Sequence, residues 1–232
     1  STVLLWLAKK AFFGHCPFPF IHVDTTFKIP EMIAYRDKVA KEMNLDLIVH
    51  TNSEAIKCGM GPDKGRLVCC KALKTEGLQQ VTKLYEFEGL IVGVRRDEEG
   101  SRSKERVFSE RNKQDEWDYS NQPPELWNQF KTDFPKGNHI RVHPLLAWNE
   151  LDIWEYIKRE EIQVIDLYFS KNGERYRSLG CAPCTNKVKS DAKTVDDIIE
   201  ELKHTTVSER AGRAQDQEDS YAMQKLRKDG YM

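Results

Sequence analysis

Apolar residues follow two different spacings along the N-terminal half of the chain. Helical spacing, with apolar side chains three and four residues apart, occurs over residues 3–13, 31–43 and 73–84. Short continuous apolar runs, which are typical of strands buried on both faces, lie at residues 19–25, 45–50 and 89–93. This alternation predicts an α/β fold, in which a parallel sheet is connected by right-handed crossovers and flanked by helices.

The C-terminal half is less regular. Residues 97–124 are strongly charged and have no apolar period, so we expect a long loop there. The run at 140–145 predicts a last short strand. Asn149 is expected to begin the helix 150–159, because its side-chain oxygen can accept hydrogen bonds from the free N–H groups of the first turn. A second capped helix is expected over 196–203, after a cysteine-containing turn.

Length and charge narrow the function classes. The 232 residues exceed the length of one average domain, about 150 residues, so we expect an α/β domain over 1–174 and a smaller, partly irregular C-terminal extension over 175–232. The net charge of −1 lacks the basic excess of proteins that bind nucleic acid through its phosphates. No apolar run approaches the ~20 residues of a membrane span, and no secretory signal is visible. We therefore expect a cytoplasmic protein that does not contact a membrane.

Two polar segments follow predicted strands, where ligands bind in open parallel sheets. Asp24 and Thr25 end the first strand, and an ordinary strand-to-loop transition is the alternative interpretation. Arg95 and Arg96 begin a run of mixed charges that ends at Arg106. Guanidinium groups match the oxygens of phosphate and sulfate in pairs, so this run can bind a polyanion. The alternative is a solvated loop of salt bridges.

A third basic segment lies near the C-terminus. Residues 205–213 combine hydroxyl side chains, a glycine and two guanidinium groups, those of Arg210 and Arg213. This combination suits a turn that binds an anion. Equally, the segment can be a tail that packs on the domain surface.

Four of the six cysteines form two pairs. Cys69 and Cys70 are adjacent, and Cys181 and Cys184 form a C-x-x-C motif in a turn with glycine and proline. Six cysteines are too few for a secreted scaffold built on disulfides, which indicates a reducing compartment. Four thiolates can hold an iron–sulfur cluster or a zinc ion. Unligated thiols are the third interpretation.

Segments along nearly the whole chain resemble, in order, the small catalytic subunit of the bacterial heterodimeric ATP sulfurylases. The matching segments are HVDT at 22–25, LKTEGL at 73–78, RRDEE at 95–99, NQPPELW at 121–127, DIWEYI at 152–157 and SER at 208–210. These subunits belong to the PP-loop ATP pyrophosphatases, which are related to the phosphoadenosine-phosphosulfate reductases. The resemblance implies an adenine-nucleotide α-hydrolase-like parallel sheet with flanking helices.

The resemblance also implies a reaction, in which ATP and sulfate give adenosine 5′-phosphosulfate and pyrophosphate. Arg95 and Arg96 are then expected to bind sulfate or the phosphate oxygens. Asp24 is expected to meet the nucleotide or to hold Mg²⁺ through its carboxylate. These three residues are the catalytic candidates.

The nucleotide contacts implied by the resemblance come from both ends of the chain. Asp24 and Thr25 would meet ATP at the end of their strand, and Arg210 and Arg213 would close the site. The family's pyrophosphate-binding loop has the sequence Ser-x-Gly-Lys-Asp-Ser. Only the last residue of this loop has a counterpart in the chain, which is Ser1. We expect the rest of that loop to precede Ser1 in a longer protein.

A partner and a second cofactor follow from the same comparison. The family couples this uphill reaction to GTP hydrolysis on a larger GTPase subunit, and the segments around Trp127 and Trp154 are candidate docking anchors, since interface cores favour aromatic residues. The two cysteine pairs resemble those that hold a [4Fe–4S] cluster in adenylylsulfate reductases and in sulfurtransferases of DNA phosphorothioation. No cysteine follows Cys184, which argues against reduction of a sulfonucleotide.

Two other functions compete with sulfate adenylylation. In the first, ATP activates a DNA phosphate or an RNA base for sulfur insertion, and the cluster handles the sulfur. The cysteine pairs favour this function, and the near-neutral charge disfavours it. In the second, the chain is a binding subunit without catalytic activity, because the glycines and lysine of the pyrophosphate loop are absent.

Overall fold

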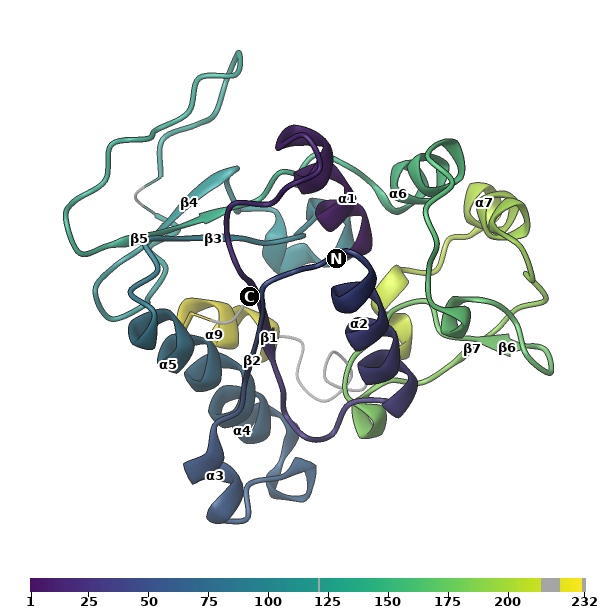
Figure 1. Ribbon diagram of the computed structural model, residues 1–232, viewed down its shortest axis with the longest axis horizontal. Coiled ribbons are helices and arrows are strands. Elements are labelled where there is room, and N and C mark those ends of the chain that lie inside the picture. The colour runs from purple at the N-terminus through teal and green to yellow at the C-terminus, as the bar shows by residue number, and fades with distance from the viewer. Residues whose placement is uncertain (121, 214–221, 231–232) are drawn as a thin grey trace.

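Short helices and strands alternate along the computed structural model, which describes residues 1–120, 122–213 and 222–230 (Figure 1). The strands are β1 (Phe20–Val23), β2 (Leu47–His50), β3 (Gly89–Ile91), β4 (Phe108–Arg111), β5 (His139–Val142), β6 (Glu174–Arg175) and β7 (Val188–Lys189). The α-helices are α1 (Thr2–Ala11), α2 (Pro30–Glu42), α3 (Ser53–Lys57), α4 (Arg66–Cys70), α5 (Glu76–Leu84), α6 (Glu150–Arg159), α7 (Val195–His204) and α9 (Ala222–Lys228). None of these described helices is long and apolar enough to cross a membrane. The first residue of the predicted segment 121–127 and parts of the extension 175–232 lie outside the described residues.

The strands pair in three small sheets. β1 and β2 are parallel, with Phe20 opposite Leu47, and β3 and β5 are parallel, with Leu90 opposite Arg141. β4 completes the second sheet on the other side of β5, and β6 pairs with β7. The predicted parallel pairing is therefore confirmed, but the predicted burial of β1, β2 and β3 on both faces is wrong, since their residues are half-buried or exposed except for Leu90. Within the described residues β1 has only β2 as a partner and β3 only β5, so the parallel strands form two pieces.

Helix α5 connects the two parallel pieces through apolar packing. Its Leu78 and Val81 form one cluster with Leu90 of β3, and side chains of β1 and β2 pack against the same cluster. Before α5, residues Lys71–Thr75 form a π-helical turn that continues directly from α4. The helix predicted over 73–84 is thus present, but its first turn is wider than an α-helical turn.

The long loop predicted over 97–124 is wrong in one respect, since β4 lies within it and pairs antiparallel with β5. Two 3-10 turns, Arg96–Glu98 and Gly100–Arg102, precede this strand. β4 has no apolar alternation because its inward-facing residues, Ser109 and Arg111, are polar and fully buried. Their polar groups bond to neighbouring polar side chains, which replaces the apolar face of an ordinary strand.

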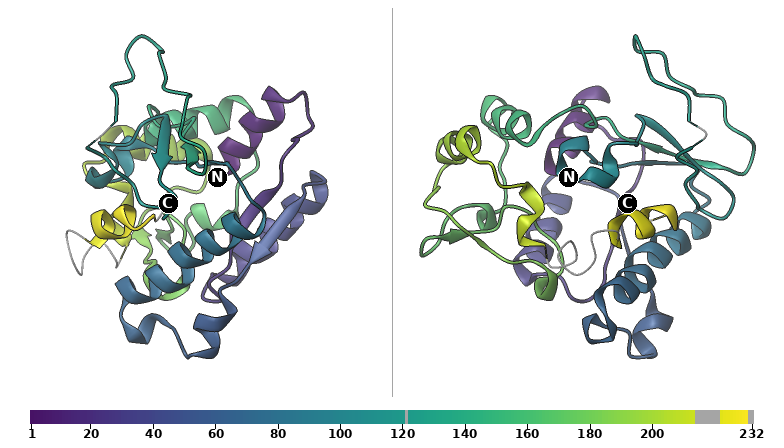
Figure 2. Two further views of the ribbon diagram at one scale, coloured as in Figure 1. Left: turned by 90° about the vertical axis from the view of Figure 1, so that its left-hand side faces the viewer. Right: turned by 180° about the vertical axis from the view of Figure 1, so that it is seen from behind.

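The main apolar core lies between α1, α6 and α7 (Figure 2). Trp154 of α6 is only 5% exposed and packs in this core, so its predicted role as an exposed docking anchor is wrong. Asn149 begins α6 as predicted, since its side chain accepts the N–H of Asp152 at 2.9 Å and a reciprocal bond completes a capping box. Helix α7, which belongs to the predicted extension, contributes Ile198 and Ile199 to the same core.

Candidate functional site

The segment after β3 forms a buried network of charges around Arg95. This side chain donates to Asp97 at 2.9 Å and pairs with Glu98 at 3.6 Å and with the carboxylate of Glu209. Burial opposes the charge of Arg95, but Glu209, Glu98 and Asp97 outweigh it and hold its pKa above the ordinary value. Arg95 is therefore a permanent positive charge in a fixed place.

Arg210 joins the same network from the other end of the chain. It lies in the 3-10 turn Glu209–Gly212 and approaches Glu99 at 3.5 Å, while Arg102 and Arg227 reach Glu99 at 3.0 and 3.1 Å. Burial alone would raise the pKa of Glu99, but Arg210, Arg102 and Arg227 lower it to about 2. Two of the predicted anion-binding segments thus meet through the carboxylates of Glu209 and Glu99.

Ser1 and Arg96 both lie beside this network. A Cβ atom on Gly93 would lie 3.8 Å from the Ser1 nitrogen. The Ser1 amino group interacts electrostatically with Arg95 and its carboxylate partners. Arg96 is exposed, and its guanidinium donates to the Glu105 carbonyl at 3.3 Å. Arg95 and Arg96 are adjacent in sequence but do not form one site.

Asp24 and Thr25 end β1 next to the C-x-x-C motif. The half-buried carboxylate of Asp24 accepts the N–H of Thr26 at 2.8 Å. Thr25 is fully buried, and its hydroxyl oxygen lies 3.1 Å from the sulfur of Cys181. Among the described residues, no hydrogen bond or ion pair joins Asp24 to Arg95.

The four paired cysteines are buried and close enough to influence one another. Cys69 and Cys70 are 9% and 3% exposed, and Cys181 and Cys184 are 5% and 4% exposed. Burial raises the pKa of Cys69 to about 11, and the other three sulfurs add to this rise. Burial and Cys181 likewise raise the pKa of Cys184. The two halves of the chain therefore bring four sulfur ligands into one region.

Positive side chains surround these sulfurs. Burial would raise the pKa of Cys181, but Lys74, Lys28 and a hydrogen bond from Thr25 outweigh it and lower the pKa, and Arg213 acts in the same direction. Lys74 is itself only 9% exposed and acts on Cys69 and Cys184 as well. Such cations stabilise the negative charge that four thiolates bring to a metal centre.

The chemistry of the donor set fits an iron–sulfur cluster, which four cysteine thiolates hold. A single zinc ion requires all its ligands around one point. Over residues 1–120, 122–213 and 222–230, no three side chains of His, Cys, Asp or Glu have the arrangement that one metal ion requires. The donor types therefore suit a cluster, while the described residues do not have the geometry of a metal site.

The buried contacts of Glu105, Arg111 and Arg227 in the charge network were not predicted from the sequence. Glu105 and Arg111 are fully buried, and Arg227 reaches Glu105 from α9 at 2.8 Å. Helix α9 lies beside α4 and α5 (Figure 2). One feature of the sequence indicated the strand β4. Ser109 and Arg111 are two residues apart, which is the spacing of side chains on one face of a strand. Glu209, the partner of Arg95, is the middle residue of the segment SER at 208–210 that is part of the resemblance.

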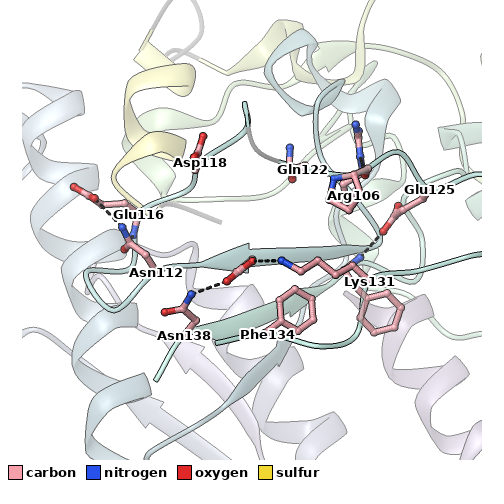
Figure 3. Close-up of a pocket in the computed structure, with 12 residues that line it drawn as sticks. Arg106, Asn112, Glu116, Asp118, Gln122, Glu125, Lys131, Phe134 and Asn138 are labelled. Carbon is pink, nitrogen blue, oxygen red and sulfur yellow. Dashed lines mark hydrogen bonds and ion pairs between the residues drawn. The ribbon is translucent and has the colours of Figure 1, made fainter. Parts of the chain in front are cut away.

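A cavity of about 250 Å³ lies away from all of these residues, against β4 and the connection that follows it (Figure 3). Glu110, one of its lining residues, binds Lys131 at 3.0 Å and Asn138 at 2.6 Å. Glu125 accepts the backbone N–H groups of Val107 and Phe108 at 2.7 and 3.0 Å. Its polar lining is thus largely bonded within the protein, and it includes Arg106, the last residue of the predicted anion-binding run, but none of the other predicted site residues.

Comparison with known proteins gave matches over most or all of the chain. The family model of the phosphoadenosine phosphosulfate reductase domain matches residues 1–187. The sulfate adenylyltransferase subunit 2 of Psychromonas ingrahamii is 43% identical, and the match covers 100% of this chain and 87% of the relative. The protein of the same name from a Marinomonas strain is 44% identical with the same coverage. Among solved structures, phosphoadenylyl-sulfate reductase from Candida auris is 17% identical over 77% of each chain, with a TM-score of 0.48.

Proposed function

The chain belongs to the sulfate adenylyltransferase subunit 2 family, and on this premise we propose that it makes adenosine 5′-phosphosulfate and pyrophosphate from ATP and sulfate. A sulfate oxygen attacks the α-phosphorus of ATP, the bond from this phosphorus to the bridging oxygen breaks, and pyrophosphate leaves with the electron pair. The protein forms no covalent bond in this step. Its contribution is to align the reactants and to stabilise the charge that develops on the leaving group.

The observation that carries this proposal is the junction of two distant segments around Arg95. Glu209 pairs with Arg95, and the next residue, Arg210, pairs with Glu99. Two guanidinium groups are thereby held in one charged region at the end of β3. We propose that sulfate competes with the Glu209 carboxylate for Arg95, so that the carboxylate keeps the site ordered until the anion arrives.

We assign the nucleotide and its metal ion to the end of β1. Ser1 would contact ATP, Asp24 would hold Mg²⁺ through its carboxylate, and Arg210 would neutralise the phosphates. The predicted contact of the Thr25 side chain with ATP is wrong, because this side chain is fully buried against Cys181. The half-burial of Asp24 leaves its carboxylate accessible to a hydrated cation, and Mg²⁺ keeps several waters when it binds protein carboxylates. Arg96, which is exposed, would act in the approach of the anions rather than in their final position.

We further propose that the four buried cysteines, Cys69, Cys70, Cys181 and Cys184, hold a [4Fe–4S] cluster. When bound, such a cluster supplies a redox-active centre with labile sulfur chemistry. The proximity of the two buried cysteine pairs supports a second function as well. In that function ATP activates a nucleic-acid acceptor for sulfur insertion next to the cluster.

A heteromeric assembly follows from the relatives, which are named as a second subunit. We propose that the partner is a larger GTPase subunit, because the phosphosulfate anhydride is high in energy and its formation needs a coupled hydrolysis. Trp127 is 86% exposed and remains the candidate docking anchor. The boundary between the two parts of the chain at 174/175 stays a prediction.

The release of pyrophosphate from ATP tests the proposed function. We expect release that depends on sulfate and increases when the GTPase subunit and GTP are added. Arg95→Gln should abolish it, whereas Arg159→Gln, at a side chain 69% exposed, should not change it. Release that requires nucleic acid and ignores sulfate would support the sulfurtransferase instead. If Arg95→Gln retains the full rate, the assignment of the anion site is wrong.

A further inference from the structure

The C-x-x-C motif forms a turn, residues 181–184, that is bonded directly to the end of β1. The Thr25 hydroxyl oxygen lies 3.1 Å from the Cys181 sulfur, and this contact is buried. The N–H of Ala182 donates to the carbonyl of Phe27 at 2.7 Å. One side-chain contact and one backbone bond thus fix the loop after β1 against this cysteine turn.

Arg213 binds the other side of the cysteine turn. Its Nε donates to the Ser178 hydroxyl at 2.7 Å, its Nη1 to the Thr185 hydroxyl at 3.0 Å, and its Nη2 to the Leu179 carbonyl. The Thr185 hydroxyl in turn donates to the Cys181 carbonyl at 2.9 Å. One guanidinium group therefore holds the residues on both sides of the turn.

Two glycines permit this close approach. A Cβ atom on Gly180 would lie 1.8 Å from Nη1 of Arg213, so a larger residue would displace the guanidinium. A Cβ atom on Gly212 would lie 2.8 Å from the carbonyl oxygen of Asn186. The N–H of Asn186 donates to the Gly212 carbonyl at 3.0 Å, so the backbones themselves are in contact here. The chain therefore has glycines, Gly180 and Gly212, where the cysteine turn and the segment of Arg213 meet.

From these contacts we infer that the cysteine turn positions the two ATP-facing segments relative to each other, and that Arg213 is a positioning residue and not a ligand of the anion. The inference rests on the proposed function, because it concerns the same site. Arg213 directly follows the 3-10 turn that contains Glu209 and Arg210. Fixing Arg213 therefore fixes Glu209 and Arg210, the residues that pair with Arg95 and Glu99. The contact of Thr25 with Cys181 fixes the end of β1 in the same way.

Three substitutions distinguish positioning from direct binding. Arg213→Gln removes the charged hydrogen bonds, and we expect the KM for ATP to rise about tenfold while kcat stays within about twofold. Arg213→Lys keeps the charge but cannot reach three acceptors, so it should not restore the KM. Gly180→Ala removes no functional group, yet it should raise the KM similarly by displacing the guanidinium.

Arg175→Gln is the matched control. Arg175 is a fully buried arginine of the same extension, and its hydrogen bonds go to Ser190 at 3.1 Å and to Glu201 at 2.6 Å. It should lower stability without changing the KM for ATP. Equal KM increases in Arg175→Gln and Arg213→Gln would assign the effect to general destabilisation and overturn the inference. Restoration of the KM by Arg213→Lys would overturn it as well, since a charge alone would then suffice.

Hydrogen exchange tests the inference without the reaction. In Arg213→Gln, the amides of residues 24–29 and 209–213 should lose protection together, and in Arg175→Gln they should not. Unchanged protection in Arg213→Gln would overturn the positioning role. If the unsubstituted protein releases no pyrophosphate in response to sulfate, the proposed function fails, and the exchange result still decides the inference.

Discussion

Glu105 is the fully buried carboxylate at the centre of the charge network, and its removal tests how much that network contributes to stability. It lies 2.8 Å from Nη1 of Arg227 and 3.3 Å from Nη2 of Arg111, and the Ser109 hydroxyl donates to it at 2.9 Å. Burial would raise the pKa of Glu105, but Arg111, His143 and Arg227 lower it, so the carboxylate is ionised at neutral pH. Glu105→Gln removes this charge with little change in volume and leaves buried guanidinium groups short of their counter-charge.

Removing one partner of a buried ion pair destabilises a protein by about 3–5 kcal/mol. This is a large share of the total free energy of unfolding, which is about 5–15 kcal/mol for most domains. Each kcal/mol lowers Tm by about 2–4 °C in a chain of this length, so we expect Glu105→Gln to melt roughly 6–20 °C lower. Urea denaturation measures the free energy directly.

Glu110→Gln is the control for Glu105→Gln. Glu110 lies on β4, shortly after Glu105 in sequence, but its partner Lys131, at 3.0 Å, is 41% exposed (Figure 3). Exposed ion pairs contribute only about 0–1 kcal/mol. If both variants lose less than about 1 kcal/mol, the buried network does not stabilise the fold in the way described, and the reasoning is refuted.

Four further substitutions test the fold. Burial lowers the pKa of His143 from 6.5 to about 4, so the unfolded chain binds a proton that the folded chain does not. The free energy of unfolding should therefore fall by up to about 3 kcal/mol as pH drops from 6.5 to 4. His143→Gln should flatten this part of the profile in urea titrations, and an unchanged slope would contradict the assignment. Asn149→Ala removes the capping box and should lower the free energy of unfolding by about 1 kcal/mol; no measurable loss would contradict the cap. Trp154→Ala should lose about 3–5 kcal/mol and Trp127→Ala less than about 0.5 kcal/mol, and equal losses would contradict the burial of Trp154.

Regular elements were predictable where burial leaves an apolar period. The strands β1, β2, β3 and β5 and the helix α6 lie within a few residues of the predicted ranges, because each has an apolar face that a neighbouring element covers. Trp154 shows the limit of this approach. Trp154 lies three residues before Ile157, a helical spacing that is typical of a buried face. An aromatic residue also suits a protein interface, and local spacing does not distinguish a core residue from an interface residue.

The candidate site was less predictable, because its contacts join residues that are far apart in sequence. Arg227 pairs with Glu99 across 128 positions, and Thr25 meets Cys181 across 156. Local spacing contains no information about such pairs. The chemistry of the four cysteines was visible in their pairing, but their convergence became visible only in three dimensions. β4 was missed because charged groups that neutralise one another can fill a buried strand without any apolar pattern.

The π-helical turn at Lys71–Thr75 has a consequence for how this protein tolerates change in length. Such a turn contains one residue more than an α-helix would use. Deleting one residue there would rotate α4 by about 100° relative to α5 and shorten the path by about 1.5 Å. The cysteine pair at the end of α4 would then turn away from Cys181 and Cys184 while α5 stayed in place. We therefore expect the extra residue and the cysteine pair to be gained or lost together among related chains.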